Sequence, residues 1–183
     1  MTWLLDFDEA YWKRGASGDG PSARIDIVGE IDRDLTACIA AELEDCAEAV
    51  ELEVYVDSPG GDFAAAFDLF VHIARHRAGR KTAIIRRAES GALLAALAAD
   101  QRIAEPGASI LLHGASAPCI GRETAAAHLE AAEHLRWLDA NKAALFAHRT
   151  GMSPEIFAAA MADEEPAPLA WCLANNLITQ IQE

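Results

Sequence analysis

TAIIRRAESGALLAALAA, residues 82–99, is the stretch that decides the fold. It opens with an apolar run from Thr82 to Ile85 and passes through Ser90 into an unbroken series of alanine and leucine. This order predicts a strand over 81–87 that leads into a helix over 90–99, with a hydroxyl at the junction. The first turn of a helix offers unpaired N–H groups and a positive dipole potential, which suit an oxyanion formed beside that hydroxyl.

The segments on either side repeat the alternation of strand and helix. We expect further strands over 24–31, 52–56, 102–104 and 109–113, and helices over about 34–49 and 62–76. One long helical pattern then covers about 122–149, and it is followed by short helices over 155–161 and 167–174 and a brief strand over 177–181. Such alternation predicts an α/β fold with a parallel sheet and right-handed crossovers.

Composition limits the class of protein and of partner. The 183 residues predict one domain over 23–183, preceded by an aromatic arm and flexible connector at 1–22. The net charge of −14, with no cluster of Lys and Arg, argues against nucleic acid or an anionic membrane as partner. Four scattered cysteines, no apolar run of membrane-spanning length and no basic segment at the start favour a cytoplasmic protein with reduced thiols.

A second apolar run supplies a candidate base. His113 ends the run 109–112, and Ser58-Pro59-Gly60-Gly61 forms a turn upstream whose glycines let the backbone approach a ligand closely. A nucleophile, a base and such a turn together favour serine-type acyl transfer. Each feature alone has a plainer explanation, since a serine caps helices, a histidine fills cores and a diglycine makes turns. The other five histidines form no metal-ligand set, so we expect no metal.

The order and spacing of these motifs resemble the proteolytic subunit of the Clp protease and its relatives, the phage-type prohead proteases. The resemblance covers about 24–181, and four groups of residues carry it: Val28-Gly29-Glu30-Ile31, Ser58-Pro59-Gly60-Gly61, Ala88-Glu89-Ser90-Gly91-Ala92, and Arg102-Ile103-Ala104 with Leu112-His113. It implies the ClpP/crotonase-like spiral of ββα units, with 122–149 as a long projecting handle helix. It also implies a serine-type endopeptidase that uses no cofactor.

The resemblance assigns a role to each site residue. Ser90 matches the nucleophile and His113 the general base, while the N–H groups of Gly61 and Gly91 match the oxyanion hole. Counting back from the last apolar segment places the third member of the triad at Glu164, with Asp163 as the alternative. The implied partners are a peptide or protein substrate, further copies of the chain in a homo-oligomer or ring, and an AAA+ unfoldase or capsid proteins.

Several residues depart from the family pattern. Position 164 is a glutamate where an aspartate is usual, Glu89 puts a charge before the nucleophile, and Gly114 follows the base. A catalytically inactive ClpP-like scaffold or regulatory subunit is therefore a second hypothesis. A third is a crotonase-type acyl-CoA enzyme, which the segment from Gly91 to Ala104 also resembles.

Overall fold

The computed structural model describes residues 20–117, 121 and 124–183, so most of the predicted arm and connector lies outside the described residues. A parallel sheet of five strands, in the order β1-β2-β3-β4-β5, forms its centre. The strands are β1 (Ser22–Val28), β2 (Glu51–Ser58), β3 (Arg80–Glu89), β4 (Gln101–Leu111) and β5 (Gln180–Ile181). The helices are α1 (Arg33–Asp45), α2 (Phe63–Arg75), α3 (Ala92–Leu97), α4 (Ala125–Thr150), α5 (Pro154–Asp163) and α6 (Leu169–Ala174).

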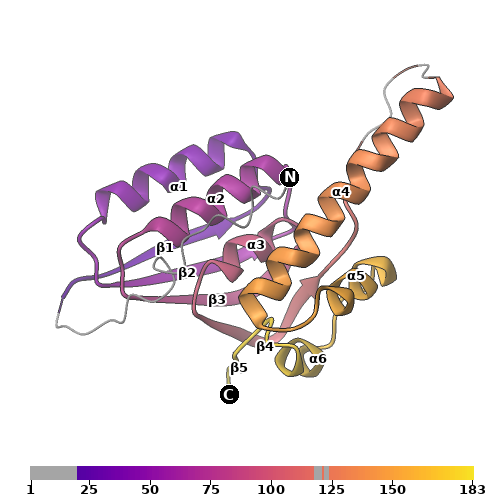
Figure 1. The fold of residues 1–183 in the computed structure, drawn as a ribbon. Helices are drawn as coiled ribbons and strands as arrows, with labels where there is room; N and C mark the ends of the chain where they lie inside the picture. Colours follow the sequence, from indigo (N-terminus) through magenta and orange to yellow (C-terminus); the bar gives the residue numbers. More distant parts are fainter. Residues whose placement is uncertain (1–19, 118–120, 122–123) are drawn as a thin grey trace.

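Each connection in the first half of the sheet crosses over through one helix. Because consecutive strands are neighbours and crossovers are right-handed, α1, α2 and α3 lie side by side over one face of the sheet (Figure 1). The burial of β2 follows this arrangement: Leu52, Val54 and Val56 are buried under the helices, and the residues between them are half-buried on the other face. The expected α/β fold with parallel strands is thus confirmed.

Aspartates begin both of the long crossover helices. Asp32 accepts a hydrogen bond from the N–H of Leu35, and Asp62 accepts one from the N–H of Ala65, each at 2.8 Å. Such caps satisfy N–H groups that have no partner within the helix. The cap at Asp62 fixes where α2 begins, immediately after the diglycine turn.

Several predicted boundaries differ from the structure by a few residues, and two of the differences have a clear local cause. The strands expected over 102–104 and 109–113 are one strand, β4, because the Pro106-Gly107 pair is accommodated as an irregularity within it. The ladder pairs Ile85 with Ala104 and then Arg87 with Ser109, so the extra residues of β4 bulge out between these two pairs. The long helix begins at Ala125 rather than near 122, because Thr124 caps it by accepting from the N–H of Ala127.

Helix α4 is the projecting handle that the resemblance implied. Its N-terminal half extends beyond the sheet (Figure 1), and Leu129 there is 65 % exposed. Its C-terminal half is anchored by Phe146, which packs edge-on against Phe157 of α5 at 5.6 Å between ring centroids. Phe157 in turn packs against Trp171 of α6. These aromatic contacts bury the C-terminal half of the handle, whereas its N-terminal half carries the exposed Leu129.

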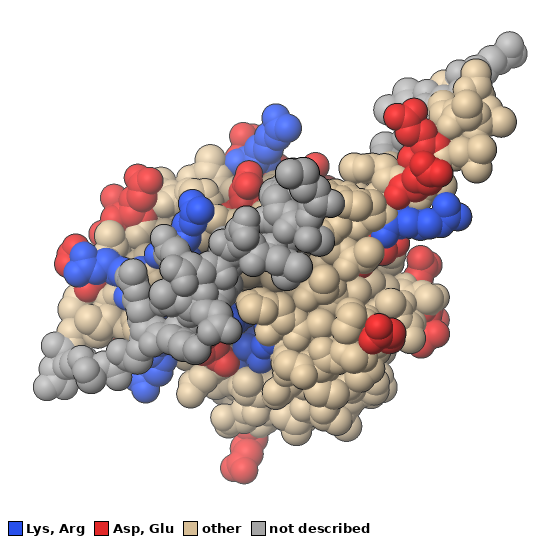
Figure 2. Space-filling model, in the orientation of Figure 1, with Lys and Arg blue, Asp and Glu red and all other residues tan. Residues whose placement is uncertain are grey.

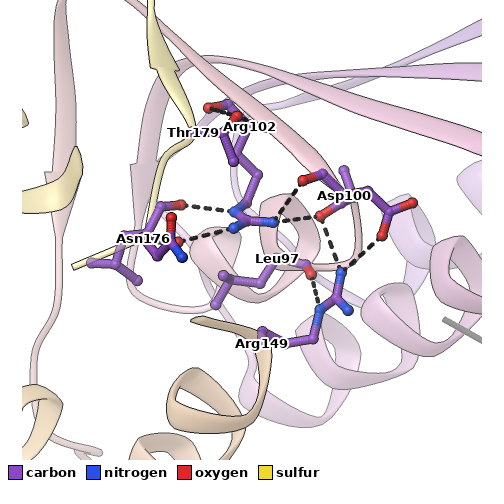
Figure 3. A network of polar contacts seen from close by, with 8 residues as sticks. Leu97, Asp100, Arg102, Arg149, Asn176 and Thr179 are labelled. Atoms are coloured by element: carbon purple, nitrogen blue, oxygen red, sulfur yellow. Dashed lines mark hydrogen bonds and ion pairs between the residues drawn. The ribbon is translucent and has the colours of Figure 1, made fainter. Parts of the chain in front are cut away.

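Two arginines form hydrogen bonds with the carbonyl groups at the C-terminal end of α3. Arg149 donates to the carbonyl of Leu97, and Arg102 donates to the carbonyls of Ala99 and Asp100 (Figure 3). Arg102 also reaches the carbonyls of Asn176 and Leu177, so it ties α3 to the segment before β5. Cations at a helix C-terminus satisfy carbonyls that lack partners and oppose the negative end of the dipole. Burial lowers the pKa of Arg102 to about 10.

The visible surface shows no gathering of one charge. In Figure 2, Lys and Arg side chains lie among Asp and Glu rather than in a separate patch. No described helix combines the length and apolar character needed to cross a membrane. Within the same residues, no three His, Cys, Asp or Glu side chains are grouped so that they could hold a metal ion.

Candidate active site

Ser90 lies at a sharp junction between a strand and a helix. Strand β3 ends at Glu89, α3 begins at Ala92, and Ser90 between them adopts the left-handed region with a φ of 53°. Its N–H donates to the carbonyl of Leu111 at 2.9 Å, and its own carbonyl accepts from the N–H of Leu93 at 3.2 Å. A non-glycine residue held in this region stores strain, and such residues are common at catalytic sites.

The diglycine turn packs directly against this junction. Gly60 has a φ of 88°, and a Cβ placed on it would lie 2.6 Å from the carbonyl oxygen of Glu89 and 2.7 Å from the Cβ of Ser90. A Cβ on Gly61 would overlap the backbone of Ile31. Only glycine therefore fits at either position. The hydroxyl of Ser58 accepts from the N–H of Gly60 at 3.0 Å and holds the turn in place.

Two backbone N–H groups face this junction without a partner. Neither Gly61 nor Gly91 donates a hydrogen bond from its N–H to any described residue. They lie close together, because a Cβ placed on Gly91 would be 4.0 Å from the nitrogen of Gly61. Both line a cavity of about 330 Å³ together with Ser90 and His113. The structure thus brings four of the predicted site residues to one cavity, and the two N–H groups there can donate hydrogen bonds to an oxyanion.

His113 follows the end of β4 and is half-buried at the cavity wall. Its imidazole makes no hydrogen bond to Ser90 or to a carboxylate within the described part of the chain. Its backbone carbonyl accepts a hydrogen bond from Lys142 Nζ at 2.7 Å. The candidate base is therefore held through its main chain.

Glu164 lies on the other side of the segment that follows the base. It is the C-cap residue that follows α5, with a φ of 52°, and it lines a groove of about 390 Å³ that Gly114 also lines. The chain beyond it pairs antiparallel with β4: Pro166 opposes Leu111, and Ala167 donates to the carbonyl of Ile110 at 2.8 Å. This isolated bridge brings the chain just after Glu164 beside the end of β4, two residues before His113. Asp163 is the last residue of α5 and is exposed.

The charge at Glu89 is directed away from the cavity. Its carboxylate accepts a hydrogen bond from the hydroxyl of Ser109 on the neighbouring strand β4, at 2.6 Å. The Glu89 side chain therefore strengthens the pairing of β3 with β4 just before Ser90.

Two residues that the sequence analysis did not single out form hydrogen bonds with the segment 113–115, which contains the candidate base. Both come from α4: Lys142 lines the cavity, and Asp139 accepts a hydrogen bond from the N–H of Ala115 at 2.6 Å. Desolvation by burial lowers the pKa of Lys142, and its ion pair with Asp139 opposes that effect. No local pattern marks these residues, because in sequence they are an ordinary acid and base on a long helix.

Comparison with known proteins places this geometry in a family. The family model described as Clp protease matches residues 21–179. Among solved structures, a ClpP1 mutant from Listeria monocytogenes superimposes with a TM-score of 0.76, at 16 % sequence identity, over 96 % of this chain and 94 % of that one. No curated protein matches the sequence. At this identity the structural likeness establishes the fold, and the family model establishes the family.

Proposed function

The chain belongs to the Clp protease family, and we propose that it is a serine endopeptidase with Ser90 as nucleophile and His113 as general base. Members of this family are generally serine peptidases. Glu164 is the orienting acid in this proposal, and Gly61 and Gly91 form the oxyanion hole. Glu164 is preferred to Asp163 for that role because it lines the groove beside Gly114, which Asp163 does not line.

The reaction would follow the usual course of acyl transfer. His113 removes the proton from Ser90 as its Oγ attacks the carbonyl carbon of the peptide bond. The N–H groups of Gly61 and Gly91 donate to the oxyanion, and one such donor is worth about 3 kcal/mol of barrier. The C–N bond then breaks as His113 gives the proton to the leaving amine. Water, activated by the same imidazole, releases the acyl group from Ser90.

One observation carries this proposal: Ser90, His113 and the two free N–H groups line one cavity. The test is labelling by a fluorophosphonate, which reacts with activated serines, of the wild type beside Ser90→Ala. We expect labelling of the wild type only, together with cleavage of a fluorescent casein that the variant lacks. Equal labelling of both proteins, or none of either, would refute the assignment.

An inactive ClpP-like scaffold or regulatory subunit is the second candidate. It is favoured by the absence, among the described residues, of a hydrogen bond from the His113 imidazole to Ser90 or to a carboxylate. The same labelling experiment decides between the two, since an unactivated serine does not react. The matched family model is that of Clp protease, which gives no support to the acyl-CoA alternative.

The handle and the thiols suggest the setting in which the protein works. Family members typically form oligomeric rings. The N-terminal half of α4 exposes Leu129 and Trp137, which are available for contact with further copies. An AAA+ unfoldase or capsid proteins are proposed as further partners. Cys38, Cys46 and Cys172 are free thiols, as expected in the reducing cytoplasm.

A further inference from the structure

The segment after the candidate base is tied to the handle helix at two points. His113, Gly114 and Ala115 belong to no helix or strand, so neighbouring strands do not fix their backbone. Lys142 Nζ donates to the carbonyl of His113 at 2.7 Å, and the N–H of Ala115 donates to Asp139 Oδ1 at 2.6 Å. One acceptor and one donor of the segment, two residues apart, are thus engaged by two side chains of α4.

These two side chains support one another. Asp139 and Lys142 are three residues apart on α4 and so share a face of the helix. Their charged groups are 3.4 Å apart, and the side chain of Lys142 is only 11 % exposed. A cation this far buried is costly unless it has partners. Here the carbonyl of His113 and the carboxylate of Asp139 supply them, which fixes the Lys142 side chain in one geometry.

We propose that Asp139 and Lys142 form a clamp that sets the position of His113 relative to Ser90. Both are positioning residues, because they act on the main chain at 113–115 and not on the reacting atoms. The inference rests on the proposed function and deepens it. Since the imidazole has no hydrogen-bond partner among the described residues, its location depends on this backbone anchorage. Misplacing a catalytic group by about 1 Å can cost on the order of 100-fold in rate.

Four variants separate the two contacts. Lys142→Met removes the ammonium group but keeps a side chain of similar length, and Lys142→Arg restores a cationic donor. Asp139→Ala removes the acceptor for Ala115, and Asp139→Asn keeps an oxygen there while removing the charge. Glu133→Ala is the matched control, since it removes an exposed charge on α4 from a residue that lines neither the cavity at Ser90 nor the groove at Glu164.

The readout is fluorophosphonate labelling of Ser90, resolved into a maximal rate constant and a half-saturating probe concentration. We expect Lys142→Met and Asp139→Ala to lower the rate constant by at least about tenfold, with the half-saturating concentration within about twofold of wild type. Lys142→Arg and Asp139→Asn should recover most of the rate, and Glu133→Ala should match wild type. Wild-type rate constants in both Lys142→Met and Asp139→Ala, or equal losses in Asp139→Asn and Asp139→Ala, would overturn the clamp.

Hydrogen exchange tests the clamp without any activity. Peptides covering 112–117 should exchange faster in Asp139→Ala than in Asp139→Asn or wild type, because the N–H of Ala115 loses its acceptor. Unchanged exchange in Asp139→Ala would also refute the clamp. If wild-type Ser90 is not labelled while this exchange difference is present, the peptidase proposal fails and the anchorage itself stands.

Discussion

Gly60 and Gly29 form a natural pair for testing how closely the diglycine turn is packed against Ser90, the candidate nucleophile. Their φ angles are 88° and 89°, so alanine suffers the same backbone strain at both positions. An added Cβ meets nothing within 4 Å at Gly29. At Gly60 it would lie 2.6 Å from the carbonyl oxygen of Glu89, 2.7 Å from the Cβ of Ser90 and 2.9 Å from the nitrogen of Gly91.

The difference between the two variants isolates the cost of this contact. Left-handed backbone costs an L-residue about 1–2 kcal/mol, which both Gly29→Ala and Gly60→Ala must bear. Overpacking adds about 1–3 kcal/mol at Gly60 alone. We therefore expect Gly60→Ala to be less stable than wild type by about 2–5 kcal/mol and Gly29→Ala by about 1–2 kcal/mol, as measured by urea denaturation.

Activity should separate the two variants more sharply than stability. Relief of the contact at Gly60 requires Ser90 and the N–H of Gly91 to move together, so labelling of Ser90 should fall by on the order of 100-fold. Gly29→Ala should be labelled at the wild-type rate. Equal denaturation midpoints for the two variants, or undiminished labelling of Gly60→Ala, would show that the turn does not press on the nucleophile as the structure has it.

Three further perturbations test other parts of the structure. Ser90→Gly should be more stable than Ser90→Ala by about 1 kcal/mol in urea denaturation, because glycine adopts a φ of 53° without strain; equal midpoints would argue against that conformation. Arg102→Met should cost at least about 3 kcal/mol by the same measurement, since it removes the Arg102 donor from the carbonyls of Asp100, Asn176 and Leu177, while the carbonyl of Ala99 keeps Arg149 as a donor (Figure 3); the exposed Arg24→Met is the control, expected near the wild-type midpoint. Burial lowers the pKa of His76, whose Nδ1 accepts from the N–H of Ala78, so the unfolded chain takes up the proton first and stability should fall as the pH drops below about 6.5. His76→Gln should lose that part of the slope, and an unchanged dependence of unfolding on pH would contradict this.

The alternation of strand and helix was predictable because each element of the first half is a local pattern. β2 alternates buried and half-buried residues, and the aspartates before α1 and α2 mark their starts. The continuity of β4 could not be predicted in this way. Pro106-Gly107 is a turn signal, and Gly107 does adopt a φ of 78°, yet pairing with β3 resumes at Ser109. Hydrogen bonding to a neighbouring strand outweighed the local preference for a turn.

In the candidate site, too, some residues are positioned by the local sequence and others by contacts with distant parts of the chain. Ser90 and Gly91 are set by the junction of β3 with α3, so the order of residues from 82 to 99 was enough to locate them. The anchorage of His113 depends on Lys142, 29 residues later along the chain, through a hydrogen bond to its carbonyl. Such a contact leaves no local sequence signal, because any long side chain on that face of α4 would give the same pattern.

A consequence is that the candidate nucleophile and the candidate base are positioned by different parts of the molecule. Ser90 stays in place as long as the centre of the sheet is folded, since its N–H bonds to Leu111 and its Cβ packs against the diglycine turn. His113 stays in place only while the C-terminal half of α4 is packed, because Asp139 and Lys142 of that helix form the hydrogen bonds that hold the segment 113–115. A change that loosens α4 should therefore abolish labelling of Ser90 before it unfolds the sheet.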